Sequence, residues 1–375
     1  MPKVAVFNTQ FLPYSQTFVY EELRQHQRYA AEVFARRRLL AERFPYPDVH
    51  VAGRLYGVTR TSARFDRRFA SAGFALVHAH FGTGAVYGLR WAERFALPLV
   101  VSFHGHDVTR LCSYERFYPT NWRYSVLSRR LFARMTLGLC ASVELRDLLI
   151  GLGVDAGKLR EHRLGIDLSA FGKGERDIDR VHVAMVGRLV PKKGFDLGLR
   201  AFADAARTQP HVRLTIAGDG ELERKLRELS AQLGLGARVT FAGALPARDV
   251  AALLARSDIL LAPSVIDARG DRDSGLIVVK EASASEVVPI GSLHGGIPDI
   301  IDDGVTGFLV PEGDVFALAE RLRRLIADPA LRARMGTAAR AKMERQYDNR
   351  QCVERLEGFY DDAVALFARD LRPQP

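Results

Sequence analysis

The chain has 375 residues, of which 47% are hydrophobic and 26% charged, a composition typical of a globular protein with enough apolar mass for two domains. Its net charge of +10 favours anionic partners, but the sequence has no zinc-finger spacing, RNA-binding aromatic strand or basic zipper, so we expect no nucleic-acid partner. No signal peptide is expected at the amino terminus, and no apolar run approaches the ~18 residues of a membrane span. The widely spaced Cys112, Cys140 and Cys352 predict reduced thiols in a cytoplasmic protein.

Short β-rich runs alternate with longer helical stretches through the first half of the chain. Predicted strands cover 4–8, 76–80, 99–103 and 137–142, and a stretch with helical periodicity follows each of them. This alternation predicts a parallel sheet covered by helices on both faces.

A polar, charged segment at 169–181 predicts a linker between a first domain (1–168) and a second domain (182–350). The alternation then begins again, with predicted strands at 181–187, 212–218, 239–243, 259–264, 287–292 and 307–310. The last part, from Val315 onward, is helical and amphipathic. Periodicity alone allows its final segment either to pack on the first domain or to form a dimer helix.

In open parallel sheets, ligands bind outside the carboxyl ends of the strands, so the residues that follow strands are the candidates for function. The segment GRLVPKKG (187–194) brings Arg188, Lys192 and Lys193 to the start of a predicted helix. Cations at a helix amino terminus make a sensible cradle for a diphosphate. The alternative is a basic loop that only faces water.

The segment HGHD begins with His104, directly after the predicted strand 99–103. A side chain there reaches toward a ligand, although a lone histidine is often structural. Asp107 is expected to cap the next helix.

The segment DRDSGLIVVKEASASE (271–286) places Asp273 eight residues before Glu281. If a helix starts near Gly275, Glu281 lies about two turns inward. A glutamate among apolar neighbours is costly without a partner. A ribose diol and a neighbouring basic side chain are the two alternatives for that partner.

Several segments, in this order along nearly the whole chain, resemble the GT4 family of retaining glycosyltransferases. They are PYSQTF, HAHFGTG, SFHGHD, HRLGID, VGRLVPKKG, IAGDGELE, VTFAG, the segment from Asp273 to Glu281, and HGGIPDIIDDGVTGFLVPEGD. Within the family, the first three most resemble the branch that builds colanic acid, amylovoran and related exopolysaccharides.

The resemblance implies an α/β protein with the GT-B fold, in which two Rossmann-like domains face a central cleft and a final helix (351–375) crosses back to the first domain. It implies transfer of a hexose, with retention of configuration, from a nucleoside-diphosphate sugar to a lipid-linked or oligosaccharide acceptor. No cofactor is expected, because the cations of 187–194 replace a metal ion; the DRD at 271–273 is therefore not expected to bind metal. Arginine is concentrated in the first half, which is either a solvated face or a face held peripherally on an anionic inner-membrane surface.

By position in the family's motifs, Arg188 and Lys193 are expected to bind the donor diphosphate and Glu281 the ribose. His104 and Asp273 are expected at the transferred sugar. Backbone N–H groups that are expected to meet the sugar or phosphate belong to Ser274, Gly275, Leu276 and Ile277.

This sequence departs from the family pattern EGxPxxxxEA, because it reads DSGLIVVKEA at the same place. Aspartate keeps the charge of glutamate but is one methylene shorter, and Leu276 replaces proline. We expect a working donor site with altered geometry at the sugar. A nucleotide-sugar 2-epimerase with the same fold and a non-catalytic glycan-binding paralogue are the alternatives.

Overall fold

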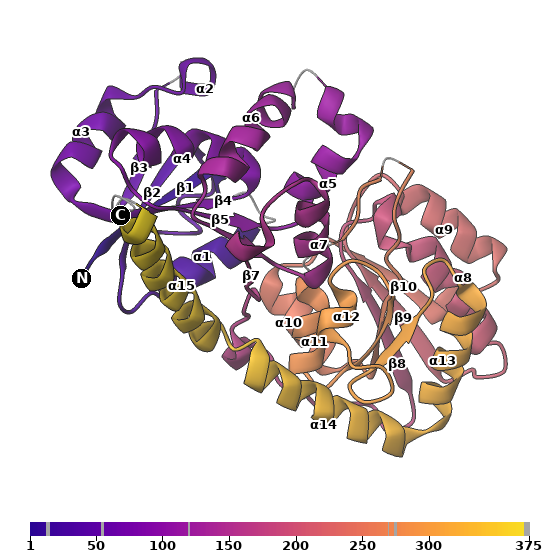
Figure 1. The fold of residues 1–375 in the computed structure, drawn as a ribbon. Coiled ribbons are helices and arrows are strands. Elements are labelled where there is room, and N and C mark those ends of the chain that lie inside the picture. Colours follow the sequence, from indigo (N-terminus) through magenta and orange to yellow (C-terminus); the bar gives the residue numbers. More distant parts are fainter. Residues whose placement is uncertain (13–15, 54–55, 119–120, 269, 274–275, 371–375) are drawn as a thin grey trace. The chain divides into compact units, whose positions relative to one another are not determined.

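The chain forms two compact units, one made of residues 1–165 with 349–375 and the other of 166–348 (Figure 1). Each unit contains one parallel sheet between layers of helices, as the alternating pattern predicts. This computed structural model describes residues 1–12, 16–53, 56–118, 121–268, 270–273 and 276–370.

The first unit has a seven-stranded parallel sheet in the order β3-β2-β1-β4-β5-β6-β7. Its strands are β1 (Lys3–Phe11), β2 (Ala30–Arg38), β3 (Val49–Val51), β4 (Phe74–His80), β5 (Leu99–Phe103), β6 (Leu137–Cys140) and β7 (Leu159–Glu161). Its helices are α1 (Thr17–Arg24), α2 (Tyr56–Thr59), α3 (Ala63–Ala72), α4 (Gly82–Arg94), α5 (His106–Cys112), α6 (Trp122–Arg134), α7 (Val143–Gly151) and α15 (Asn349–Asp370).

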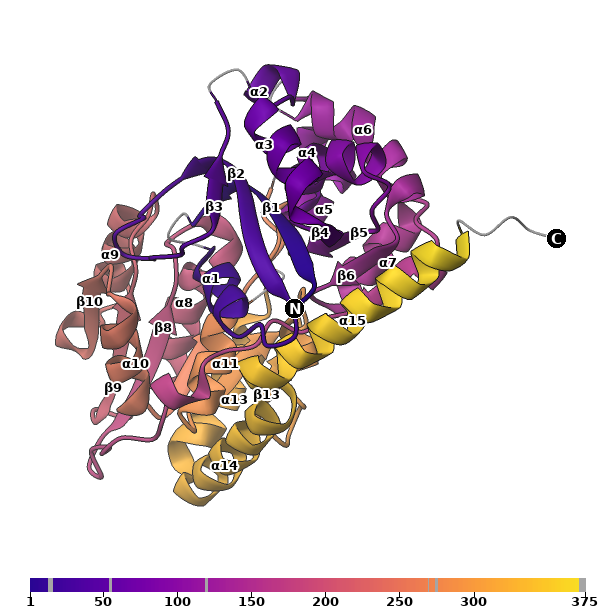
Figure 2. The ribbon, with the colours of Figure 1, turned by 90° about the vertical axis from the view of Figure 1, so that its left-hand side faces the viewer.

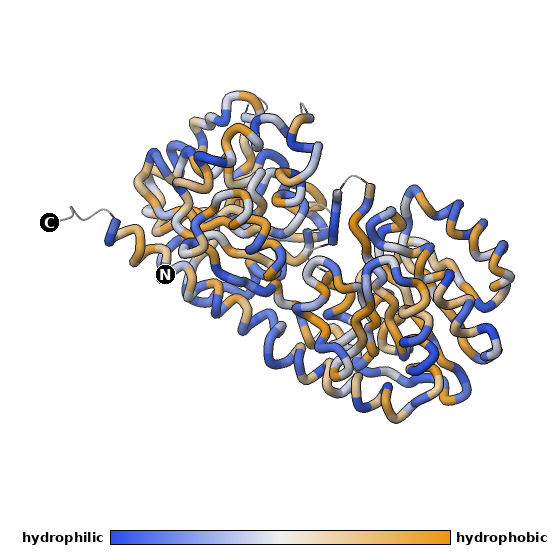
Figure 3. Tube along the Cα trace, turned by 45° about the vertical axis from the view of Figure 1, so that its right-hand side comes forward, coloured by the Kyte–Doolittle hydropathy of each residue, from blue (hydrophilic) through white to orange (hydrophobic). Residues whose placement is uncertain are grey.

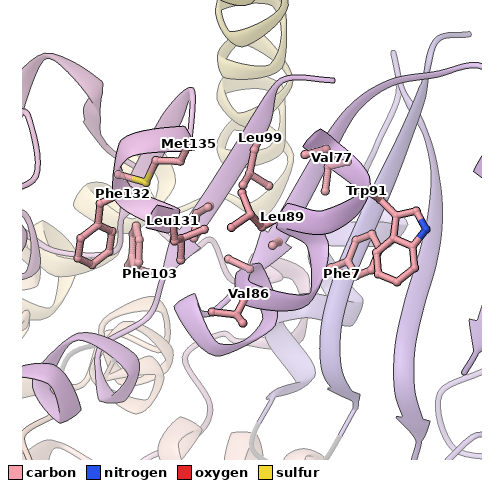
Figure 4. Close-up of a cluster of buried hydrophobic side chains, with 14 of the residues drawn as sticks. Phe7, Val77, Val86, Leu89, Trp91, Leu99, Phe103, Leu131, Phe132 and Met135 are labelled. Atoms are coloured by element: carbon pink, nitrogen blue, oxygen red, sulfur yellow. The ribbon is translucent and has the colours of Figure 1, made fainter. Parts of the chain in front are cut away.

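Alternate residues of each strand supply two separate cores in this unit. On one face, Phe7 and Val77 pack with Leu89 and Trp91 of α4, and α3, α6 and α7 complete the layer (Figure 4). On the other face, α1 and α15 cover the sheet. Since side chains alternate with a period of two, neighbouring residues of β4 enter different cores.

The last helix, α15, lies along the sheet of the first unit (Figure 2). Its buried Glu357 accepts hydrogen bonds from the backbone N–H groups of Gln27, Arg28 and Tyr29, at 2.9, 2.8 and 3.0 Å. These bonds satisfy three backbone donors of the turn after α1.

The second unit has a six-stranded parallel sheet in the order β10-β9-β8-β11-β12-β13. Its strands are β8 (Val181–Val186), β9 (Val212–Ala217), β10 (Val239–Gly243), β11 (Ile259–Ala262), β12 (Val288–Ser292) and β13 (Phe308–Val310). Its helices are α8 (Phe195–Ala205), α9 (Glu223–Gln232), α10 (Ala247–Ala255), α11 (Ile277–Ala284), α12 (Ile297–Ile300), α13 (Val315–Ala327) and α14 (Pro329–Gln346). Hydrophobic and hydrophilic stretches alternate along its outer helices (Figure 3).

Three strands of the first unit, β2, β3 and β7, are absent from the sequence prediction. In β2 the buried Glu32 interrupts the apolar pattern of the sequence. Inside the fold, Arg68 and Lys3 form ion pairs with this carboxylate. The arginines at the end of β2 look like a surface run in the sequence, yet they continue a strand paired with β1.

The predicted linker 169–181 runs along the second unit. Gly174 N–H donates to the carbonyl of Ala255 at 3.0 Å, and Arg176 donates to the carbonyl of Ser285 at 2.8 Å. Among the described residues, no helix combines the length and apolar character needed to cross a bilayer.

Replacing Leu356 of α15 by alanine tests how strongly this helix stabilises the first unit. The side chain is fully buried, so Leu356→Ala should lower the free energy of unfolding by about 2–5 kcal/mol in urea denaturation. Val364→Ala, at a position of the same helix that is 37% exposed, should cost less than about 1 kcal/mol. Equal effects of the two substitutions would contradict this packing.

Candidate functional site

Each sheet has one place where the strand order reverses: between β1 and β4 in the first unit, and between β8 and β11 in the second. In open parallel sheets, ligands bind at such a reversal, outside the carboxyl ends of the strands. Of the residues predicted for the site, His104 lies at this edge of the first unit, and Arg188, Lys193, Asp273 and the start of α11 lie at this edge of the second. Ser274 and Gly275 lie outside the described residues.

The loop after β8 is held close to the loop after β11. Gly194 has a φ of 62°, and a Cβ there would lie 2.0 Å from the carbonyl oxygen of Pro263, so only glycine fits. Lys192 is buried, with Nζ 3.0 Å from Asp271 Oδ2 and 3.2 Å from the carbonyl oxygen of Arg272. This lysine therefore ties the two loops together and is not available to a ligand.

Lys193 and Asp273, predicted for different parts of the donor, form an ion pair. Lys193 Nζ lies 2.5 Å from Asp273 Oδ2, and the Ser264 hydroxyl donates to the same oxygen at 3.3 Å. Burial pushes the pKa of Asp273 up, but the charges of Lys193 and Lys192 outweigh burial and hold it below its usual value. The carboxylate is therefore ionised and fixed beside the lysine.

Two residues to which the sequence analysis gave no role, His294 and Glu312, hold Asp273 from the other side. The backbone N–H of Asp273 donates to His294 Nε2 at 3.0 Å, so this nitrogen carries no proton. His294 Nδ1 then donates to Glu312 Oε2 at 2.9 Å, and Glu312 Oε1 accepts from the N–H of Ile266 at 2.5 Å. Both residues follow strands, β12 and β13, within the segment HGGIPDIIDDGVTGFLVPEGD, which was the available sequence signal.

Arg188 differs from the two lysines, because its side chain is exposed and makes no hydrogen bond or ion pair within the described part of the chain. The GDG turn after β9 supports the loop that carries it. A Cβ at Gly218 would lie 1.8 Å from the carbonyl oxygen of Gly187, and Leu189 N–H donates to the carbonyl of Asp219 at 2.7 Å. These glycines are explained by close backbone packing.

The described part of α11 begins at Ile277, so Glu281 lies about one turn into the helix and not about two turns as expected. Leu276 is buried, and Ile277 supplies the first helical N–H. The half-buried Glu281 carboxylate has no hydrogen-bond or ion-pair partner among the described residues. Burial raises its pKa to about 7, and the positive charge of Lys280 only partly opposes this shift.

In the first unit, His104 follows β5, and its ring contacts those of Phe18 and Phe81, at centroid distances of 4.9 and 4.6 Å. Asp107 lies within the first turn of α5 and is not its N-cap, which is Gly105. The Asp107 carboxylate accepts from the N–H groups of Gly82 (2.7 Å), His104 (3.2 Å) and Gly105 (3.0 Å). It therefore joins the loops after β4 and β5 and fixes the backbone at His104.

The raised pKa of Glu281 predicts a pH dependence of stability. Between about pH 4.5 and about pH 7 the folded state keeps a proton that the unfolded chain loses, so this residue lowers stability as pH rises through that window. Glu281→Gln should therefore raise the Tm relative to the wild type above pH 7 and change it little below pH 4.5. Thermal melts across this range measure the difference. Glu320→Gln, at an exposed position of α13, is the control and should leave the pH dependence unchanged; a constant Tm difference for Glu281→Gln would contradict the shift.

Two family models match the chain in succession. Residues 18–170 match "Glycosyltransferase Family 4", and residues 170–342 match "Glycosyl transferases group 1". The chain is 32% identical over 291 residues to the amylovoran biosynthesis glycosyltransferase AmsK of Erwinia amylovora, covering 75% of this chain and 69% of the relative. It is 30% identical over 282 residues to the putative colanic acid biosynthesis glycosyltransferase WcaL of Escherichia coli K12, covering 74% and 68%.

Solved structures agree on the fold. Anabaena Alr3699/HepE, crystallised with UDP, is 19% identical, with a TM-score of 0.79 over 96% of this chain and 100% of that one. Sucrose-phosphate synthase of Thermosynechococcus elongatus is 19% identical, with a TM-score of 0.77 over 97% and 100%. The family expected from the motifs is confirmed: the chain belongs to glycosyltransferase family 4, the glycosyl transferases of group 1, and is a glycosyltransferase with the GT-B fold.

Proposed function

We propose that this glycosyltransferase moves a hexose from a nucleoside-diphosphate sugar to a lipid-linked or oligosaccharide acceptor, with retention of anomeric configuration, in the synthesis of a cell-surface polysaccharide. The observation that carries the donor assignment is the exposed Arg188, which has no partner among the described residues and lies in the same loop after β8 as Lys193 of the Lys193–Asp273 pair. The relatives named for amylovoran and colanic acid biosynthesis support the pathway class. HepE structures with UDP and with UDP-glucose support the donor class.

Positive charge and helix N–H groups converge where a diphosphate would bind. Arg188 supplies a guanidinium that can bind two phosphate oxygens, and Lys193 Nζ has donors left after it bonds Asp273. The first N–H groups of α8 and α11 follow these two loops in the chain. Glu281, which has no other described partner, would accept the ribose hydroxyls.

The transfer breaks the bond between the anomeric carbon and the diphosphate oxygen and forms one to the acceptor hydroxyl on the same face. The electron pair of the broken bond goes to the diphosphate, where Arg188 and Lys193 stabilise the developing charge. The acceptor proton passes to the departing phosphate oxygen. Asp273 would hold a sugar hydroxyl, and His104 would contact the transferred sugar. The same two cations replace a metal ion in this proposal.

Thermal stabilisation of wild type and Arg188→Ala by nucleoside diphosphates and their sugars tests the donor site. The nucleoside diphosphate and nucleotide sugar of one particular base should raise the Tm of the wild type, because they bind only the folded state. Losing charge-assisted hydrogen bonds should weaken its binding roughly tenfold or more in Arg188→Ala. Arg200→Ala, at an exposed position of α8, is the control and should behave as the wild type. Equal stabilisation of Arg188→Ala and the wild type would contradict the assignment.

The products formed from the stabilising donor then separate the possible reactions. A glycosylated acceptor with retained configuration, formed equally with and without EDTA, supports the proposal. Release of a C2-epimerised nucleotide sugar without acceptor would replace it by an epimerase. Binding without turnover would favour the glycan-binding alternative.

We further propose that the first unit contacts an anionic membrane that carries the acceptor. Five large exposed apolar side chains, four of them aromatic, lie between residues 114 and 126 and are called the aromatic patch here: Tyr114, Phe117, Tyr118, Trp122 and Val126, which are 84, 69, 52, 55 and 65% exposed. Arg116 lies 4.5 Å from the ring centroid of Phe117, and Arg123 lies 5.8 Å from that of Trp122. Aromatic rings beside arginines suit the headgroup region of an anionic bilayer.

Flotation with vesicles of mixed neutral and anionic lipid tests this aromatic patch. The double variant Phe117→Ser/Trp122→Ser should lower the partition coefficient roughly tenfold or more, because two aromatic side chains stay out of the bilayer. Ile178→Ser, which changes a side chain that is 97% exposed in the second unit, should float as the wild type does. Absence of binding by the wild type, or equal binding by the double variant, would contradict the proposal.

A further inference from the structure

A buried group of polar side chains lies under the strand ends of the first unit, on the face that α1 and α15 cover. His78 and His80 alternate with Val77 and Ala79 along β4, so both histidines point into this face. Both are fully buried. Two buried histidines in one strand are unusual in an apolar core, because each imidazole needs partners there.

Glu22 of α1 is the anion of this group. It is 4% exposed, with Oε1 3.3 Å from His80 Nε2 and Oε2 3.6 Å from His162 Nε2. In the described part of the chain it forms ion pairs only with histidines. Burial pushes the pKa of Glu22 up, yet its electrostatic interactions with His80 and His162 hold it well below its usual value. A neutral imidazole whose N–H side faces a carboxylate favours the ionised form of that carboxylate.

His80 connects this anion to His104. Its Nε2 faces Glu22, and its Nδ1 lies 3.1 Å from His104 Nε2, with the two rings nearly parallel at 12°. Neither Glu22 Oε1 nor His80 Nε2 has a hydrogen-bond partner in the described part of the chain, so the carboxylate acts on the His80 ring through its charge. This charge favours a proton on His80 Nε2, so in the neutral His80 ring Nδ1 accepts from His104 Nε2–H. His104 then has one defined tautomer, and further protonation falls on its Nδ1.

The other histidine of β4 stands outside this connection. His78 Nε2 lies 2.8 Å from the hydroxyl of Ser102, and its Nδ1 lies 2.8 Å from the hydroxyl of Tyr360. Burial lowers the pKa of His78 well below its usual value, so this ring is neutral. Glu22, His78 and His80 place one potential ligand atom each within 4.8 Å of the others, but the partners of His78 favour a hydrogen-bonded network over a metal site.

We propose that Glu22 and His80 are positioning residues that hold His104 with its Nε2–H directed inward and increase the affinity of its Nδ1 for a proton. The inference rests on the proposed function for the role of His104 at the transferred sugar. An imidazolium there would stabilise negative charge or donate to a sugar hydroxyl, so its proton affinity bears on the rate. Other titratable groups that face this chain of side chains are His26, His78, His162, Tyr360, Glu357 and Asp107.

Ring-nitrogen NMR of the full-length protein with ¹⁵N-labelled histidine tests the proposal without any substrate. His104→Gln assigns the His104 signals. In the wild type, His104 should be the Nε2–H tautomer at high pH. In Glu22→Gln, its titration midpoint should fall by roughly one pH unit, because the carboxylate that favours the cation is gone.

Glu357→Gln is the matched control, because Glu357 is a buried glutamate of the same unit, 2% exposed against 4% for Glu22, and bonds backbone N–H groups. It should lower stability but leave the His104 midpoint unchanged. An unchanged tautomer and midpoint in Glu22→Gln, or an equal shift in Glu357→Gln, would overturn the proposal. If Glu22→Gln does not fold, His80→Gln takes its place and should lower the midpoint in the same direction. Stoichiometric Zn²⁺ in the purified protein, with His80 signals that change on chelation, would also overturn it.

Kinetics with the donor identified above add a second readout. The limb of the kcat/KM–pH profile that belongs to His104 should move to lower pH in Glu22→Gln, with kcat reduced and the KM for the donor little changed. Glu22→Asp keeps the charge and should restore part of kcat. A rise in donor KM alone would overturn the positioning role. If no donor is turned over, the proposed function fails, and the NMR result still decides the arrangement of His104.

Discussion

The parallel pairing of every described strand is the constraint on which both halves of the protein depend. Because the strands of each sheet run the same way, all their carboxyl ends lie along one edge, and the loops that leave them begin as neighbours. Four loops of the second unit therefore bring their polar side chains together: lysines after β8, an aspartate after β11, a histidine after β12 and a glutamate after β13. In the first unit the same rule brings Gly82, His104 and Asp107 together after β4 and β5.

Buried or half-buried carboxylates have different partners in the two units, lysines in the second and histidines in the first. In the second unit, lysines form ion pairs with the aspartates of the loop after β11. These pairs hold that acidic loop in contact with the basic loop after β8. In the first unit, histidines surround the buried Glu22, and an imidazole that shares a proton responds to small changes in its environment. The arrangement in the second unit suits an anion site that is preformed. The arrangement in the first unit suits a site in which the proton affinity of a histidine is adjusted by its neighbours.

The departure from the family pattern at Asp273 is accommodated by its surroundings. The shorter side chain reaches Lys193, while its backbone N–H is bonded to His294, whose tautomer is fixed in turn by Glu312. A carboxylate held by partners on both sides keeps one geometry without a ligand. Glu281, one turn into α11, has no such partner among the described residues, and the cost of its burial appears as a raised pKa. A ligand that supplies hydrogen-bond donors to such a buried carboxylate gains affinity from that contact.

The sequence by itself determined the α/β class, the two rounds of alternation, the family, and the loops in which most of the site lies, because apolar periodicity and motif order are local properties. It also placed Arg188 and Glu281 correctly in a basic loop and an apolar helix. Only the tertiary structure decided that Lys192 is buried, that Lys193 faces Asp273, that β2 continues through a buried glutamate, and that Glu22 reaches His104 through His80. These contacts join residues far apart in the chain, and no local pattern encodes which buried charge will find which partner.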